Sequence, residues 1–292
     1  MTRAAGPGPT VGISISDSPV DELVELGLSS LHLSHAFIEI VRHILAAGWS
    51  IAYGGDRRRP GFTEAMFDLV RTYEQRAVPG PERVTNYLAW PIWVGRRPED
   101  DAQFANVATL IKSAAPPGSP DALPPASERT ESERLLCSQA LTAMREQMTA
   151  AIDARLVLGG RVAGQMGLVP GVVEEAVLAI DAGVPLYVAG GFGGAGRVIA
   201  AALDGQSPPE LETDFQLDHT DGYRGLLDAA LLESVEPDLE GIASRLASIG
   251  LAGLRNGLSQ EDNRRLARTD DAEEVVTFVL RGLNRLHGSS PR

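Results

Sequence analysis

The stretch VPLYVAGGFGGAG, residues 184–196, joins a short apolar run to a turn that contains five glycines. Residues 184–189 predict a buried strand, and residues 197–203 predict the helix that follows the turn. The segment GFGGAG, residues 191–196, satisfies the pattern G-x-G-x-x-G between that strand and that helix. This order is typical of one βα unit of a parallel sheet, in which the backbone N–H groups of a glycine turn can approach a phosphate.

The same alternation recurs upstream of this turn. Short apolar or β-branched runs predict strands at residues 11–16, 50–53, 154–158 and the first part of 84–93, which continues as a Pro-broken loop. Apolar residues at helical spacing predict helices at residues 31–47, 61–73, 128–152 and 170–182. The pattern predicts an α/β, Rossmann-like fold: a mostly parallel sheet with helices on both faces and a helical C-terminal section.

Composition shifts along the chain suggest its organisation. We expect a disordered N-terminus over residues 1–10, an α/β domain over residues 11–207, and a helical section over residues 208–287 that packs on the sheet. Residues 114–127, AAPPGSPDALPPAS, predict a surface loop because proline fixes φ and lacks an N–H. That loop should tolerate shortening, since the cost of closing a loop grows slowly with its length.

The charge balance argues against two classes of partner. The chain has 26 basic and 39 acidic residues, a net charge of -13 that opposes binding to nucleic acid and to anionic membranes. Cys137 is the only cysteine, which excludes an internal disulfide and a cysteine metal cluster. The five histidines show no metal-binding spacing. We therefore expect a cytoplasmic protein without signal peptide, membrane span, metal or resident cofactor.

Two further glycine pairs follow predicted strands, Gly54-Gly55 and Gly159-Gly160. Ligands of open parallel sheets bind beyond the carboxyl ends of the strands, so the three glycine turns should meet at one site. Arginines after the turns, at positions 57, 58 and 161, suit bidentate contact with a pyrophosphate. For any single turn, tight packing of helix on sheet explains the glycines equally well, and a solvated loop explains the arginines.

These segments, taken in order, resemble the SLOG superfamily. The matching runs are YGGD at 53–56, GFTE at 61–64, MREQM at 144–148, LGG at 158–160, PGVVEE at 170–175 and GVPLYVAGGFGG at 183–194. That superfamily includes the lonely-guy phosphoribohydrolases, the DprA-type proteins and the ligand-sensing domains of TRPM channels and of some bacterial antiphage effectors. The resemblance covers roughly residues 11–197 and implies a Rossmann-like domain that binds nucleotides or ADP-ribose-like molecules.

The enzymatic branch hydrolyses a base–ribose bond and carries the signature P-G-G-x-G-T-x-x-E after a basic pair on a helix. The resemblance places Glu175 on the catalytic acid and Arg145 on one basic position. The chain departs from the signature at three points: Leu158 replaces the proline, residues 161–169 separate the two halves, and Val172 replaces the threonine. In addition, Met144 occupies the other basic position.

Two functions follow from these observations. The leading one is binding of a nucleotide-derived signal, NAD-derived, ADP-ribose-like or a nucleoside phosphate, as in bacterial defence signalling. The alternative is a nucleoside-phosphate N-glycosidase with Glu175 and Arg145 as catalytic residues, and a purely structural module is a third class. The residues that we expect to contact the ligand are Ser16, Gly54, Gly55, Asp56, Arg57, Arg58, Gly61, Phe62, Gly159, Gly160, Arg161, Gly171, Glu174, Gly190, Gly191, Phe192, Gly193 and Gly194.

The partner expected from this hypothesis is a small nucleotide ligand, and we expect the protein to form a homo-oligomer. We expect no attached TIR, sirtuin, nuclease or membrane segment. A sensor of this kind would therefore act through a separate effector protein or by sequestering its ligand.

Overall fold

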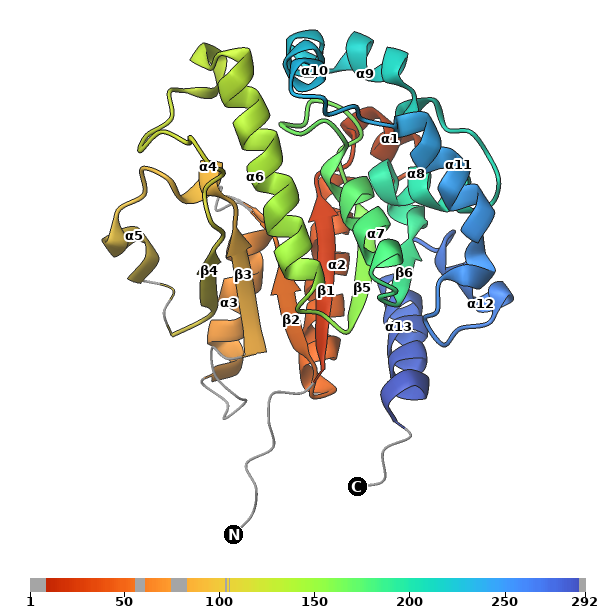
Figure 1. Ribbon diagram of the computed structural model, residues 1–292. Helices are drawn as coiled ribbons and strands as arrows, with labels where there is room; N and C mark the ends of the chain where they lie inside the picture. Colours follow the sequence, from red (N-terminus) through yellow and green to blue (C-terminus); the bar gives the residue numbers. More distant parts are fainter. Residues whose placement is uncertain (1–8, 56–60, 75–82, 103, 105, 289–292) are drawn as a thin grey trace.

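The computed structural model describes residues 9–288 except 56–60, 75–82, 103 and 105 (Figure 1). Its centre is a six-stranded sheet in which all neighbouring strands are parallel, in the order β4-β3-β2-β1-β5-β6. The strands are β1 (Thr10–Ser16), β2 (Ser50–Tyr53), β3 (Val84–Leu88), β4 (Thr109–Lys112), β5 (Ala154–Gly159) and β6 (Leu186–Ala189). The predicted Rossmann-like α/β class is confirmed.

The chain builds the sheet outward from β1 to β4 and then returns to add β5 and β6 on the other side of β1. The order reverses between β1 and β5, which is where doubly wound sheets form their ligand crevice. Ser16 pairs with Gly159, so these two strands end level with each other. The glycine turns after β2, β5 and β6 therefore lie at one edge of the sheet, as predicted.

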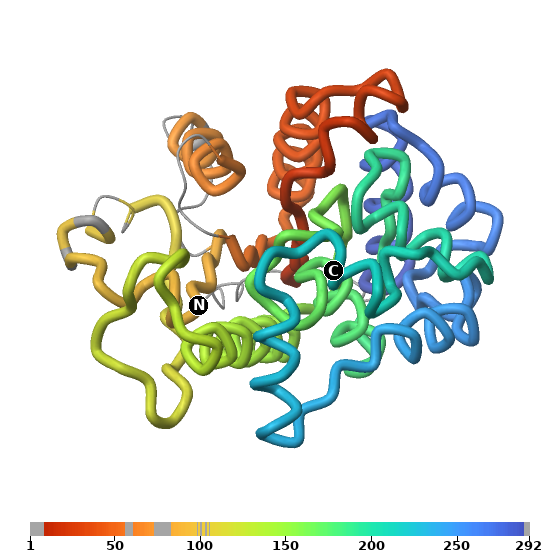
Figure 2. Tube along the Cα trace, turned by 90° about the horizontal axis from the view of Figure 1, so that it is seen from above, coloured from red at the N-terminus to blue at the C-terminus, as the bar shows by residue number. Residues whose placement is uncertain are grey.

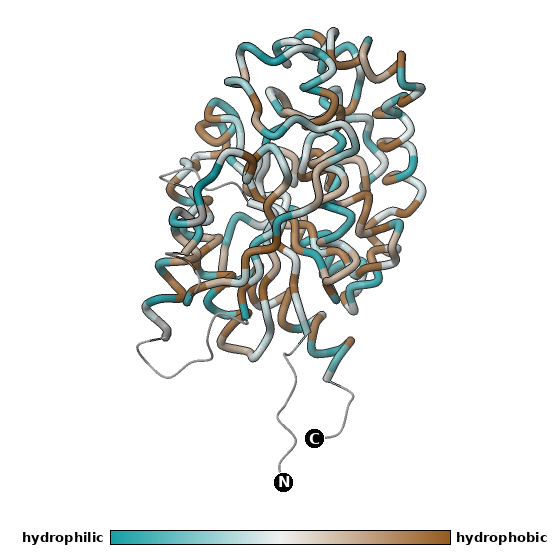
Figure 3. The backbone as a smooth tube through the Cα atoms, turned by 60° about the vertical axis from the view of Figure 1, so that its left-hand side comes forward, coloured by the Kyte–Doolittle hydropathy of each residue, from teal (hydrophilic) through white to brown (hydrophobic). Residues whose placement is uncertain are grey.

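Helices cover both faces of the sheet. One face carries α2 (Ser30–Ala46), α3 (Phe62–Glu74) and α13 (Ala272–His287), and the other carries α6 (Glu131–Thr149), α7 (Gly171–Asp181) and α8 (Gly194–Leu203). Figure 2 shows α2 and α6 on opposite sides of the strands. In Figure 3 apolar segments follow the strands through the middle of the molecule, whereas the outer helices alternate in hydropathy. The main core clusters lie between these layers.

Further helices pack around these layers. They are α1 (Val20–Glu25), α4 (Trp90–Trp93), α5 (Pro98–Ala102), α9 (Thr213–His219), α10 (Tyr223–Leu232), α11 (Leu239–Ile249) and α12 (Gln260–Leu266). Residues 90–93, predicted as part of a strand and Pro-broken loop, form α4, because Pro91 at a first-turn position costs the helix no hydrogen bond. Among the described residues, no helix is long and apolar enough to span a membrane.

The two edges of the sheet differ. At β6, the N–H of Leu186 donates to the carbonyl of Leu254 at 3.0 Å, and the amide of Asn256 donates to the carbonyl of Leu186 at 2.8 Å. The C-terminal section thus covers this edge. At the opposite edge, β4 is partly exposed and ends at Lys112, the only lysine of the chain, which pairs with Asp101 at 2.8 Å.

Replacing the buried Asn256 tests how strongly the C-terminal section is fastened to β6. Asn256 is 1% exposed, and Asn256→Ala leaves the carbonyl of Leu186 and Asn263 Oδ1 without the donor that they share. We expect a loss of about 2 to 3 kcal/mol in the free energy of unfolding, measured by urea denaturation. Asn284→Ala, at an exposed position of α13, should change stability little. Equal effects of the two substitutions would contradict this account.

Candidate ligand site at the carboxyl edge of the sheet

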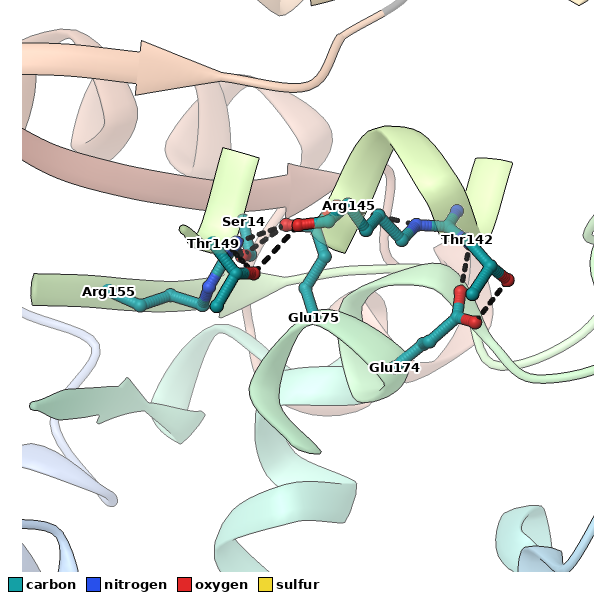
Figure 4. Close-up of polar contacts among 7 residues, drawn as sticks. All are labelled: Ser14, Thr142, Arg145, Thr149, Arg155, Glu174 and Glu175. Carbon is teal, nitrogen blue, oxygen red and sulfur yellow. Dashed lines mark hydrogen bonds and ion pairs between the residues drawn. The ribbon is translucent and has the colours of Figure 1, made fainter. Parts of the chain in front are cut away.

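Glu175 sits near the start of α7 and is buried, with 6% of its surface exposed. Its Oε2 accepts hydrogen bonds from Ser14 Oγ at 2.5 Å and from Arg155 Nη1 at 2.7 Å (Figure 4). Its Oε1 lies 3.6 Å from Arg145 Nε. The carboxylate that the resemblance places on the catalytic acid is therefore enclosed by two guanidinium groups and a hydroxyl.

Arg155 projects from the central strand β5 and is completely buried. Its guanidinium also donates to Ser14 Oγ and to Thr149 Oγ1, each at 2.8 Å. Burial lowers the pKa of Arg155, and the nearby charge of Glu175 acts in the opposite direction. Sequence reasoning treated residues 154–158 as an apolar run and missed this residue. The available signal was a charged side chain in a strand whose neighbours are all apolar.

Glu174 extends the network toward the surface. It accepts a hydrogen bond from Thr142 Oγ1 at 2.5 Å and forms an ion pair with Arg145. Arg145 also packs on Gly171, where a Cβ would lie 2.5 Å from Nη2. Glycine at this position therefore lets the guanidinium reach the first turn of α7. The structure brings Arg145, Gly171, Glu174 and Glu175 together, all of which were named as site residues.

The glycines after β5 and β6 are in close contact with other parts of the protein. A Cβ at Gly160 would lie 2.8 Å from Val172, and a Cβ at Gly159 would lie 2.8 Å from Ser18 Oγ. At Gly190 and Gly191 a Cβ would lie 2.5 Å and 2.2 Å from the carbonyl oxygens of residues 267 and 269. Close packing of protein segments thus accounts for these four glycines, and their contact with a ligand stays a prediction.

The start of α8 holds an acidic side chain. The N–H of Gly194 donates to Glu22 Oε2 at 2.9 Å, and the guanidinium of Arg197 contacts the other oxygen of Glu22. Arg197 Nη2 also lies 2.5 Å from Glu210 Oε1, and its hydrogen bonds to both carboxylates raise its pKa against the opposing effect of burial. A carboxylate from α1 thus occupies the N-terminus of α8, where the helix dipole favours negative charge. Sequence reasoning did not identify Glu22.

The rim formed at the carboxyl ends of β1 and β5 is polar. Ser16 Oγ accepts a hydrogen bond from the N–H of Arg161 at 2.9 Å, and the Arg161 guanidinium lies 3.3 Å from Asp17. The Arg161 side chain is 42% exposed. Both charged side chains of this rim, Arg161 and Asp17, are therefore open to solvent.

The other predicted contacts lie deeper or elsewhere. Phe192 is 1% exposed, and Phe62 packs edge-on against Phe37 with 5.4 Å between ring centroids. A Cβ at Gly54 would lie 3.2 Å from Met144, and a Cβ at Gly55 would overlap the ring of Tyr53. Three predicted contacts, Asp56, Arg57 and Arg58, lie outside the described part of the chain. The two predicted contacts that remain are Gly61 and Gly193.

Gly61 directly precedes α3, and its carbonyl accepts a hydrogen bond from the N–H of Ala65. Gly193 has a φ of 71°, in the left-handed region, and a Cβ there would lie 3.2 Å from Glu22. Within the described ranges, no group of histidine, cysteine, aspartate and glutamate side chains is arranged to hold a metal ion.

The Glu175 network makes a stability prediction. Glu175→Gln removes the charge that neutralises Arg155, and loss of one partner from a buried ion pair costs about 3 to 5 kcal/mol. Urea denaturation should show this loss, whereas Glu174→Gln, at a less buried carboxylate, should lose less. A Glu175→Gln protein within about 1 kcal/mol of the parent would show that Arg155 does not depend on this charge.

A family model matches most of the chain. The family model described as SLOG cluster2 matches residues 7–266. A search of curated proteins found no match. The matched range includes the whole sheet, the Glu175 network and the turn that binds Glu22. The chain therefore belongs to the SLOG cluster2 family.

Proposed function

We propose that this protein binds a nucleotide-derived anion, such as a nucleoside phosphate or an ADP-ribose-like molecule, at the carboxyl edge of its sheet. The observation that carries the proposal is the carboxylate of Glu22 on the N-terminus of α8, held by the N–H of Gly194 and by Arg197. The same donors suit a phosphate oxygen. In this proposal, a ligand phosphate takes the place of Glu22.

Three features support this location. The turn follows β6 at the carboxyl edge of the sheet and packs on the β5 turn, beside the point between β1 and β5 where the strand order reverses. Arg197 is a cation that would pair with the phosphate once Glu22 leaves, and its contact with Glu210 holds it in place. Ser16 and Arg161 lie on the rim of the neighbouring β5 turn, and we assign them contacts with the polar remainder of the ligand.

Binding without hydrolysis is the better supported activity. A catalytic carboxylate needs an oxygen that can approach the sugar or activate a water molecule. In Glu175, Oε2 is engaged by Ser14 and Arg155, and Oε1 faces Arg145. The fully buried Arg155 gives this carboxylate a structural role. These contacts favour a sensor over an N-glycosidase.

Removing the charge of Glu22 tests whether a ligand phosphate takes its place at the start of α8. Glu22→Gln should bind AMP and ADP-ribose more tightly than the parent, because the competing carboxylate is gone. Arg197→Ala should bind them more weakly, by about 10- to 150-fold, the range for loss of one charge-assisted contact. Calorimetric titration measures both changes. Glu39→Gln, an exposed glutamate of α2 paired with Arg42, is the matched control and should leave the affinity unchanged.

If Glu22→Gln bound the ligands with the same affinity as the parent or more weakly, a ligand phosphate would not replace Glu22, and Glu22 would be a permanent cap of α8.

Arg161→Ala tests the contribution of the rim separately from that of the turn before α8. The substitution should weaken the binding of ADP-ribose more than the binding of AMP, because the rim is assigned to the part of the ligand beyond the phosphate. Arg245→Ala, which removes a similarly exposed arginine paired with Asp181, should have no effect.

Incubation with substrates separates binding from turnover. The parent protein, incubated with AMP, NAD and ADP-ribose, should release no free base above the buffer rate, as measured by chromatography. Its melting temperature should nevertheless rise with the concentration of the ligand that binds. Base release that is lost in Glu175→Gln, with an unchanged circular dichroism spectrum, would favour the hydrolase instead.

A further inference from the structure

A second concave site lies between the N-terminal ends of α6 and α10, near the top of Figure 1. It is a cavity of about 150 Å³, and the loop between β5 and α7 forms one wall through Gln165 and Met166. This volume equals that of about five water molecules in the liquid. None of its lining residues belongs to the Glu175 network or contacts Glu22.

Two arginines line this cavity without acidic partners. In the described residues, neither Arg129 nor Arg134 has a carboxylate within 4.0 Å. Arg129 Nη1 has only sulfur acceptors, Cys137 Sγ at 3.5 Å and Met166 Sδ at 3.8 Å, which are weak. Its Nε donates to the carbonyl of Pro124. Most of the donor capacity of this guanidinium is therefore unused by the protein.

Arg134 lies in the first turns of α6 and packs on Gly222, the N-cap of α10. A Cβ at Gly222 would lie 2.1 Å from Arg134 Nη1. Among the described residues, the one hydrogen bond of the Arg134 side chain runs from Nε to the carbonyl of Arg129 at 3.3 Å. A cation at the N-terminus of a helix is electrostatically unfavourable, and a bound anion would relieve that repulsion.

Carboxylates also lie near this cavity. Asp221 is the one carboxylate among the lining residues, and Glu131 lies against the first turn of α10, at Gly225. Glu133 is engaged by Thr130 in the capping box of α6. The lining therefore keeps an excess of positive charge, in contrast to the chain as a whole.

One wall residue has a spare acceptor. Gln216 Nε2 donates to the carbonyls of Val162 and Glu210, which leaves Gln216 Oε1 as an acceptor for Gln165 Nε2 at 2.8 Å. This arrangement fixes the orientation of the Gln165 amide, and its Oε1 is buried without a donor. A ligand that supplies a hydroxyl or amine group would satisfy it.

We propose that the cavity between α6 and α10 binds a small organic anion, a carboxylate or phosphate monoester on an apolar body that also carries a hydrogen-bond donor. Arg129 and Arg134 bind the anionic group, Leu226 and Met166 contact the apolar body, and Gln165 accepts from the donor. This site is separate from the nucleotide site and does not depend on it.

Calorimetric titration with simple probes tests the proposal. Benzoate and phenyl phosphate represent the two anions, 4-hydroxybenzoate adds the donor, and benzyl alcohol is the neutral control. We expect the anions to bind, 4-hydroxybenzoate to bind more tightly than benzoate, and benzyl alcohol not to bind. Comparison of benzoate with phenyl phosphate identifies the preferred anion.

Variants identify the location of binding. Arg129→Ala and Arg134→Ala should each lower the affinity for the anion by about tenfold or more. Arg129→Lys should retain part of that affinity. Arg245→Ala and Arg197→Ala should leave it unchanged. The proposal is overturned if no anion binds at millimolar concentration, if benzyl alcohol binds as well as benzoate, or if Arg197→Ala abolishes binding while Arg129→Ala does not.

Discussion

A guanidinium in the middle of the sheet is the constraint on which this structure depends. Arg155 is fully buried in β5, and an unpaired charge in that position would cost several kcal/mol. Its partners come from three other elements: Ser14 of β1, Thr149 of α6 and Glu175 of α7. The arginine therefore fastens two strands and two helices at the point where the order of the sheet reverses. Any activity at this edge has to work around a carboxylate that the fold already uses.

The glycine turns show how one sequence feature can have two physical causes. Glycine lets another group approach the backbone closely, and that group can be a phosphate or a neighbouring segment of protein. At Gly190 and Gly191 the approaching group is the backbone near residues 267 and 269. At Gly194 it is the backbone of Gly160, 2.2 Å from where a Cβ would lie. The N–H of Gly194 donates to the carboxylate of Glu22, which is an anionic oxygen acceptor as a phosphate is. The proposed ligand site therefore rests on Gly194 and Arg197, not on the number of glycines.

Local patterns predicted most of the frame. The strand predicted at residues 50–53 is β2 without change, and the helix predicted at 170–182 is α7 (Gly171–Asp181) within a residue at each end. The predictions missed α1 and β4, which are short and packed by distant segments. The same limit applies to the site. Arg155 lies 141 residues from Ser14, and Glu22 lies 172 residues from Gly194, so no local spacing could connect these pairs.

The unequal edges of the sheet bear on self-association. Open strand edges are templates on which a further chain can add, and proteins protect them by covering them or by placing lysine there. At the β6 edge, the N–H and carbonyl of Leu186 already have partners from within the chain, Leu254 and Asn256. At the β4 edge, a foreign strand would have to displace the ion pair between the exposed Lys112 and Asp101. Growth into fibrils by strand addition is therefore opposed at both edges, by backbone groups that already have partners at one and by an exposed charge at the other.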